Sequence, residues 1–139
     1  MKYQTIIVGM FCCLLSGFSM AEVMVVAHVK SNLSSVDLKT LKKVFLGKTS
    51  KISGMKVTAV TLPDANAVKV EFDQKALKKN PGKMTAYWSN RIFTGKGKPL
   101  AQVQDEAEML KFLAANKSAL GYMSADTITS NVKVLLTIP

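Results

Sequence analysis

The chain has 139 residues, and its 19 Lys and Arg against 9 Asp and Glu give a formal net charge of +10 at pH 7. One histidine, two cysteines and scattered carboxylates argue against a metal centre and against catalysis by a nucleophile and its base, because both need clusters of such side chains. The basic residues are concentrated in residues 30–98, so this portion should attract phosphate-like solutes, nucleic acid or other anionic surfaces.

Residues 1–21 have the pattern of a secretory signal peptide. Lys2 precedes an apolar run over residues 6–15, and the small residues Ser19 and Ala21 precede an expected cleavage site. The unbroken apolar run is shorter than the ~20 residues that a membrane-spanning helix needs, so we expect no stable membrane anchor. Both cysteines are in this segment. The sequence therefore predicts a thiol-free, periplasmic single domain over residues 22–139.

The first part of this domain has the pattern strand, helix, strand. Residues 23–27 are nearly all apolar and rich in Val, as expected of a central strand that is buried on both faces. The following helix should begin at Ser34 or Ser35 as N-cap and end at Gly47. Its apolar stripe is Leu38, Leu41, Val44 and Phe45. Alternation over residues 56–62 predicts a second strand, which Pro63 ends.

Two further helices should follow. The first is expected to begin at Asn66, with Asp64 as the alternative N-cap. After a turn over residues 78–82, apolar side chains recur at helical spacing, so the next helix should pack this face into the core. The face consists of Met84, Tyr87, Trp88 and Ile92, and it includes the only Trp of the chain.

The last part of the chain predicts one helix and two strands. Asp105 and Glu108 form a capping box in front of an amphipathic helix that should end near Asn116. Residues 119–123 and 132–138 are typical of strands, and Gly121 indicates that another element approaches closely. Strands and helices alternate throughout. The pattern predicts an α/β fold, a single three-layer domain with a mixed or largely parallel sheet of four to five strands flanked by helices.

Two stretches are candidates for binding an anion. A helix start at Asn66 leaves backbone N–H groups unpaired towards the sheet, although Asn66 could equally serve only as a cap. The cationic loop over residues 94–98 can turn backbone N–H groups outward, although its glycines could simply end the helix. If both stretches face one edge of the sheet, they form one oxyanion site with Arg91 as a further cation. The lone His28 is expected to be a structural hydrogen-bonding residue.

Four segments, taken in order, resemble the substrate-binding component of phosphate ABC transporters. They are residues 41–48 (LKKVFLGK), 62–66 (LPDAN) with Phe72, 87–97 (YWSNRIFTGKG) and 119–122 (ALGY). The resemblance spans nearly the whole domain and implies one lobe of a type-II periplasmic binding protein, a non-catalytic fold. Binding proteins of this type close two lobes around the ligand, so a closed cleft would need another subunit.

The chain departs from this family at the oxyanion site. Family members use an Arg followed by Ser-Gly-Thr at a helix start. Here Leu62 fills the position of the arginine, and residues 66–68 read Asn-Ala-Val. Asn66 retains a polar cap, whereas both hydroxyls are missing.

The sequence leaves two functions open. The first is an exported anion-binding module that resembles a phosphate ABC transporter substrate-binding protein, for phosphate or a phosphorylated solute. Its candidate ligand-binding residues are Ser31, Asn32, Asn66, Ala67, Arg91, Thr94, Gly95, Lys96, Gly97 and Lys98. The second is a basic periplasmic interaction protein that docks on an anionic partner or surface, such as a transporter, without a small-molecule pocket. Nucleic acid is disfavoured because aromatic residues are few. We expect no cofactor, no metal and no catalytic residue.

Overall fold

The computed structural model describes residues 22–139, and the predicted signal peptide lies outside them. Five strands form one sheet in the order β5-β4-β6-β1-β7, beside a two-stranded hairpin, β2-β3. The strands are β1 (Val23–His28), β2 (Lys51–Ile52), β3 (Met55–Lys56), β4 (Thr58–Thr61), β5 (Ala101–Gln102), β6 (Ala119–Ser124) and β7 (Val132–Ile138). The predicted α/β fold with a mixed sheet is confirmed. No helix within residues 22–139 is long and apolar enough to cross a membrane.

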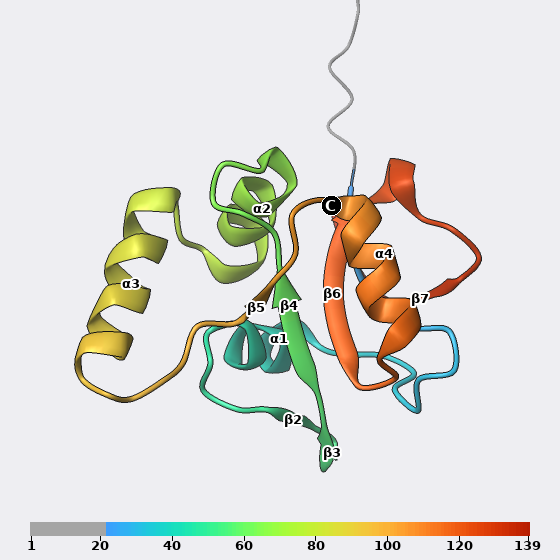
Figure 1. Ribbon diagram of the computed structural model, residues 1–139, viewed down its shortest axis with the longest axis horizontal. Helices are drawn as coiled ribbons and strands as arrows, with labels where there is room; N and C mark the ends of the chain where they lie inside the picture. Colours follow the sequence, from blue (N-terminus) through green and yellow to red (C-terminus); the bar gives the residue numbers. More distant parts are fainter. Residues whose placement is uncertain (1–21) are drawn as a thin grey trace, which may run out of the picture.

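The directions of the strands define two edges of the sheet. β4 runs parallel to β5 and β6, whereas β1 runs antiparallel to β6 and β7. Strands β4, β5, β6 and β7 therefore end on the same side, which we name the carboxyl edge and which is uppermost in Figure 1. They begin on the opposite side, the amino edge, where β1 ends.

Helices cover both faces of the sheet and give three layers. They are α1 (Leu38–Phe45), α2 (Ala67–Phe72), α3 (Pro81–Phe93) and α4 (Glu106–Ala115). The Tyr122 ring stacks on Phe72 of α2, with 4.0 Å between ring centroids, and meets Phe45 of α1 edge-on. The adjacent Gly121 lies against Met109 of α4. Because neighbouring residues of a strand point to opposite faces, α1 and α2 cover one face and α4 covers the other (Figure 1).

Most predicted helix ends are confirmed. The Asn66 side chain accepts a hydrogen bond from Val68 N at 2.9 Å, and Asp105 Oδ1 accepts one from Glu108 N at 2.8 Å. Gly47 follows α1 with φ of +71°, a conformation that suits glycine.

The expected start of α1 at Ser34 or Ser35 was wrong. The helix begins after Asp37, whose carboxylate accepts a hydrogen bond from Thr40 N at 3.1 Å. Leu33 and Val36 are both buried in the segment before the helix. This segment has no helical conformation, so burial of its two apolar side chains delays the helix to Asp37.

The third predicted helix, α3, is less buried than the sequence predicts. Met84 is its only buried residue, Tyr87 and Trp88 are half-buried, and Ile92 is 48 % exposed. Figure 1 shows the reason, because α3 stands at one side of the molecule rather than across a face of the sheet. The prediction of a continuous core face was therefore wrong for Ile92. The arrangement leaves a cavity between α3 and the rest of the domain.

Candidate functional site

A cavity of about 230 Å³ lies beneath α3 at the carboxyl edge of the sheet, and we name it the α3 cavity. Thr61 at the end of β4 and Gln102 at the end of β5 are paired in the register of the sheet, and both line the cavity. The remaining walls come from α2 and the segments before and after it, from α3, from Phe45 of α1, and from Pro99 and Leu100. In α/β proteins, ligands bind in crevices outside the carboxyl ends of parallel strands. The cavity therefore occupies the position at which this topology places a binding site.

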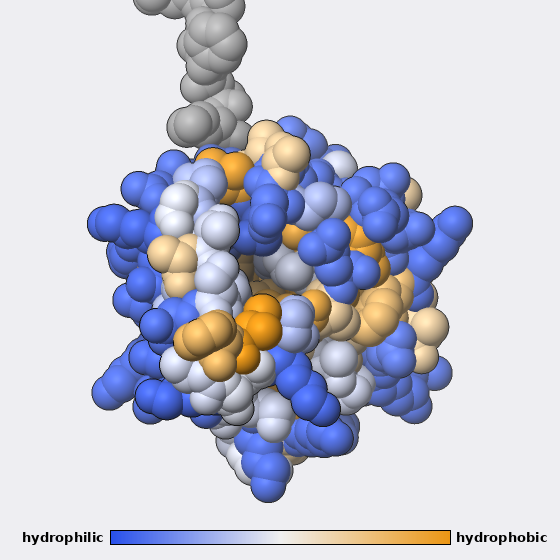
Figure 2. Space-filling model, turned by 60° about the vertical axis from the view of Figure 1, so that its left-hand side comes forward, coloured by the Kyte–Doolittle hydropathy of each residue, from blue (hydrophilic) through white to orange (hydrophobic). Residues whose placement is uncertain are grey.

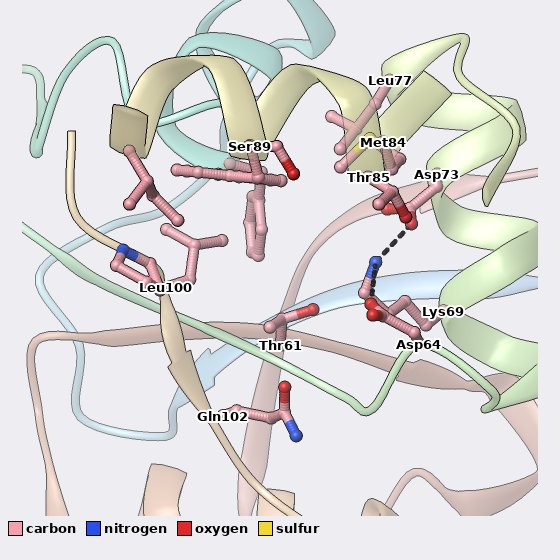
Figure 3. A pocket seen from close by; sticks show the side chains of 14 residues that line it. Thr61, Asp64, Lys69, Asp73, Leu77, Met84, Thr85, Ser89, Leu100 and Gln102 are labelled. Carbon is pink, nitrogen blue, oxygen red and sulfur yellow. Dashed lines mark hydrogen bonds and ion pairs between the residues drawn. The ribbon is translucent and has the colours of Figure 1, made fainter. Parts of the chain in front are cut away.

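An ion pair is buried at one end of the α3 cavity. The Lys69 ammonium lies 2.5 Å from Asp73 Oδ2 and 3.6 Å from Asp64 Oδ1 (Figure 3). Lys69 and Asp73 are only 7 % and 4 % exposed, whereas Asp64 is exposed. Burial raises the pKa of the Asp73 carboxyl above its usual value of 3.8, against the opposing effect of the Lys69 hydrogen bond. The cation of this cavity is therefore already engaged by carboxylates.

Two local features position these polar groups. The Tyr122 hydroxyl hydrogen-bonds to Thr61 Oγ1 at 2.8 Å and accepts from Leu62 N at 3.2 Å, which fixes the turn between β4 and α2. Burial raises the pKa of Tyr122, so the hydroxyl stays protonated. After α2 the chain forms a π-helical turn, Asp73–Leu77. Such turns are uncommon and occur frequently at functional sites.

The helix α3 is held over the cavity by its aromatic and cationic side chains. Trp88 packs against Gly47, where a Cβ atom would lie 2.9 Å from the indole ring. The Tyr87 hydroxyl donates to Leu46 O at 2.5 Å. Arg91 donates to Gly47 O and Lys96 O, both at 3.0 Å. α3 thus packs against the C-terminal end of α1.

The two predicted anion-binding stretches lie at opposite edges of the sheet. Asn66 and Ala67 follow β4 and lie at the carboxyl edge, whereas residues 94–98 precede β5 and lie at the amino edge. Figure 1 shows the same separation, because α3 descends from top to bottom before the chain enters β5. The expected convergence on one edge does not occur, so no single site contains both stretches.

The backbone of residues 94–96 completes the end of α3. Thr94 N, Gly95 N and Lys96 N donate to the carbonyl groups of Asn90, Ile92 and Arg91, respectively. Gly95 has φ of +69°, and Gly97 packs against the Arg91 guanidinium. These three N–H groups and the Nη2 group of Arg91 are therefore engaged within the fold, whereas the buried Nε of Arg91 has no hydrogen-bond partner among residues 22–139. The Lys96 and Lys98 side chains are exposed.

Ser31 and Asn32 line a second hollow, of about 270 Å³, at the amino edge. Three lysines, Lys30, Lys56 and Lys117, line the same hollow, which we name the lysine hollow. Ser31 Oγ accepts from Leu33 N at 3.2 Å, so its O–H remains free to donate. Nearby His28 accepts a hydrogen bond from Lys30 N through Nδ1, which is the structural role predicted for it.

The loops at the amino edge are rich in lysine and contain no carboxylate. The segments at the amino edge, residues 29–34, 46–57, 94–99 and 116–118, contain seven lysines and no Asp or Glu. The segments that follow β4, β5 and β6 at the carboxyl edge each contain at least one carboxylate, namely Asp64, Asp105, Glu106, Glu108 and Asp126. The predicted basic portion, residues 30–98, thus contributes lysines to the amino edge, and its other basic residues lie on or next to α1, α2 and α3.

Sequence reasoning missed the residues of the α3 cavity. Lys69 and Asp73 are four residues apart in a helix, a spacing that is usually read as a surface ion pair. Thr61 and Gln102 end two short strands, and only the parallel pairing of β4 with β5 reveals that they are neighbours. Polar residues at strand ends were the available signal.

Comparison with known proteins gives a match only at the level of structure. No family model and no curated sequence matches the chain. A phosphate ABC transporter substrate-binding protein from Clostridium perfringens, solved with bound phosphate, superposes with a TM-score of 0.65 at 12 % identity. The match covers 83 % of this chain and 44 % of that protein. The chain has the fold of one lobe of a phosphate-binding protein.

Two further structures support the same resemblance. An ABC-type phosphate transport receptor from Vibrio cholerae gives a TM-score of 0.63 at 15 % identity, over 83 % of this chain and 45 % of the receptor. PstS from Borrelia burgdorferi gives 0.62 at 9 % identity, over 83 % and 46 %. The chain thus spans less than half the length of these proteins. At such identities the resemblance establishes the fold and not the ligand.

Proposed function

We propose that the protein is an exported, non-catalytic module that binds phosphate or a phosphorylated solute in the lysine hollow. The supporting observation is the charge of this hollow, because the described residues that line it include three lysines beside Ser31 and Asn32 and no Asp or Glu. An ammonium group is a point charge that suits a phosphate oxygen, and a free hydroxyl or amide adds directional hydrogen bonds. The structural neighbours include a protein solved with bound phosphate, and export rests on the predicted signal peptide.

A second candidate function is docking on a larger polyanion. Lys48, Lys96 and Lys98 extend the basic edge beyond the lysine hollow, and Arg91 joins Lys96 to Gly47 through its two hydrogen bonds. The missing Arg and Ser-Gly-Thr hydroxyls of the family site also favour this function. An edge of several lysines suits a partner with many charges, such as an anionic surface or an acidic transporter domain.

Calorimetric titration of the purified protein with phosphate, sulfate and AMP, at low and moderate salt, tests the proposal. We expect saturable binding that weakens with salt and is lost in Lys56→Ala/Lys117→Ala. Lys83→Ala/Lys111→Ala removes the same charge outside the amino edge and should bind as wild type. Asn66→Ala should lose about 0.5–2 kcal/mol of stability as a helix cap but retain binding, because it lies at the opposite edge.

The same titrations separate the two functions. Under docking, no small anion binds saturably, whereas long-chain polyphosphate binds and requires Lys96 and Lys98 as well as the lysine hollow. Phosphate binding that persists in Lys56→Ala/Lys117→Ala would place the anion elsewhere. Absence of binding to small anions and to polyphosphate alike would refute both functions.

A further inference from the structure

We infer that the α3 cavity is a second binding site, separate from the lysine hollow, for an uncharged polyhydroxylated solute of about monosaccharide size. The cavity lies at the carboxyl edge, whereas the lysine hollow lies at the amino edge. Figure 2 shows a hollow on the side of the molecule where α3 comes forward, with hydrophobic surface in and beside it and hydrophilic surface around it.

The charge balance of the cavity disfavours an anion. Among the described residues that line it, Lys69 is the only cation, and its ammonium is already paired with Asp73 and lies near Asp64. A phosphate would have to displace a buried carboxylate at 2.5 Å and then lie beside two negative groups. Like charges at such distances repel strongly in a partly desolvated site. This cavity therefore differs in kind from the lysine hollow.

A cationic ligand is disfavoured as well. Asp73 is already paired with the Lys69 ammonium, which belongs to the same helix. An ammonium group of a ligand would have to displace Lys69 from this pair. Asp64 is 89 % exposed at its side chain, and ion pairs with exposed carboxylates contribute little. A paired Lys and Asp nevertheless keep lone pairs and N–H groups available, which are the groups that hydroxyls can bridge.

Uncharged hydrogen-bonding groups complete the polar side of the cavity. Thr61 and Gln102 lie close together, and Ser89 of α3 lies across the cavity from them (Figure 3). Gln102 and Ser89 are both exposed, and within residues 22–139 neither side chain forms a hydrogen bond, so both are open to a ligand. Donors and acceptors on two sides, without net cationic charge, match a ligand that carries several hydroxyl groups.

The remaining wall is apolar and contains an aromatic ring. Trp88, Met84, Ile92 and Leu100 line it, and Trp88 is only half-buried although it packs against Gly47. A sugar ring has polar edges and apolar C–H faces, so it can place one face against this wall while its hydroxyls meet Thr61 and Gln102. The volume of about 230 Å³ is below the roughly 300 Å³ at which drug-sized sites begin, which limits the ligand to a small solute.

The position of Trp88 gives a direct test, because it is the only Trp of the chain and lines the cavity. The purified protein is titrated with glucose, galactose, mannose and ribose, and in parallel with inorganic phosphate and ethylammonium chloride. Tryptophan fluorescence and thermal unfolding are both recorded. We expect at least one neutral sugar to give a saturable fluorescence change and a rise in melting temperature, and ethylammonium to give neither.

Two glutamines of one segment provide matched variants. Gln102→Ala should weaken sugar binding about tenfold, the effect of losing one or two hydrogen bonds. Gln104→Ala removes an exposed glutamine that does not line the cavity, and it should bind as wild type. Lys56→Ala/Lys117→Ala should also retain sugar binding, so a failure of the proposed anion site leaves this test unaffected.

Three outcomes would overturn the inference. The first is no saturable change in either measurement with any of the four sugars. The second is saturation by ethylammonium or phosphate that Gln102→Ala weakens, which would assign the cavity to a charged ligand. The third is sugar binding that Gln102→Ala and Gln104→Ala affect equally.

Discussion

Lys69 and Asp73 lie one helical turn apart, and their 2.5 Å contact is almost entirely buried although both side chains are charged. On the same helix, Glu71 and Lys75 form an ion pair of equal spacing, at 2.7 Å, that is more exposed to solvent. Two pairs with one geometry but different burial allow the effect of desolvation to be measured directly.

We expect Asp73→Ala to lower the free energy of unfolding by about 3–5 kcal/mol, because it leaves the buried Lys69 without its close partner. Glu71→Ala should cost less than about 1 kcal/mol, since its pair is more exposed. The double variant Lys69→Met/Asp73→Leu should be as stable as wild type or more so. Urea unfolding of the four proteins measures these values, and equal losses in Asp73→Ala and Glu71→Ala would contradict the expectation.

The pH dependence of stability should also report Asp73. Its pKa is raised above 3.8 by burial, so the folded state binds this proton more tightly than the unfolded state. The resulting stabilisation is fully present below pH 3.8 and is lost as the pH rises through the raised pKa. We expect the stability of wild type relative to Asp73→Asn to fall as the pH rises from 3.8 through the raised pKa. Urea titrations across this range test the sign, and a relative stability that rises with pH would refute it.

Arg91 should determine how firmly α3 is attached. Its guanidinium donates to Gly47 O and Lys96 O, which the single ammonium of a lysine cannot reproduce in the same planar geometry. Arg91→Lys should cost about 1–3 kcal/mol and accelerate amide hydrogen exchange in α3 more than in β1 or β6. Lys83→Ala, an exposed change on the same helix, is the control. Uniform exchange rates in the two variants would show that Arg91 does not hold the helix.

Gly121 should tolerate no side chain. A Cβ atom there would lie 2.6 Å from Met109 Sδ and 3.2 Å from Val60 Cγ1, so Gly121→Ala should cost about 1–3 kcal/mol through overpacking. Met109→Ala combined with Gly121→Ala should lose less than the sum of the single losses, because the clash is removed. Gly82→Ala is the control, since the nearest atom there is at 3.5 Å. Thermal unfolding of wild type and of the four variants measures these losses, and additive losses would argue against the contact.

Local patterns in the sequence predicted which helices and strands form better than they predicted which residues are buried. The Val-rich run that became β1 and the caps at Asn66 and Asp105 depend on neighbouring residues, and all three are confirmed. The exposure of Ile92 and the burial of Lys69 depend instead on where α3 packs, which residues distant in the sequence decide.

The prediction of the site was limited because it depends on contacts between residues that are distant in the sequence. The hypothesis that Asn66 and Lys96 converge needed the order and direction of the strands, which no local pattern contains. The parallel pairing of β4 with β5 separates them and brings Thr61 and Gln102 together instead.

The loops at the amino edge contain seven lysines and no Asp or Glu, so this edge has a positive electrostatic potential. Near an anionic surface the protein should turn its amino edge towards the surface and its carboxyl edge towards solvent. The opening beneath α3 would then face away from the surface and stay accessible while the lysines are engaged. Because counterions screen this attraction within about 8 Å at physiological ionic strength, the orientation should be set during the final approach to the surface.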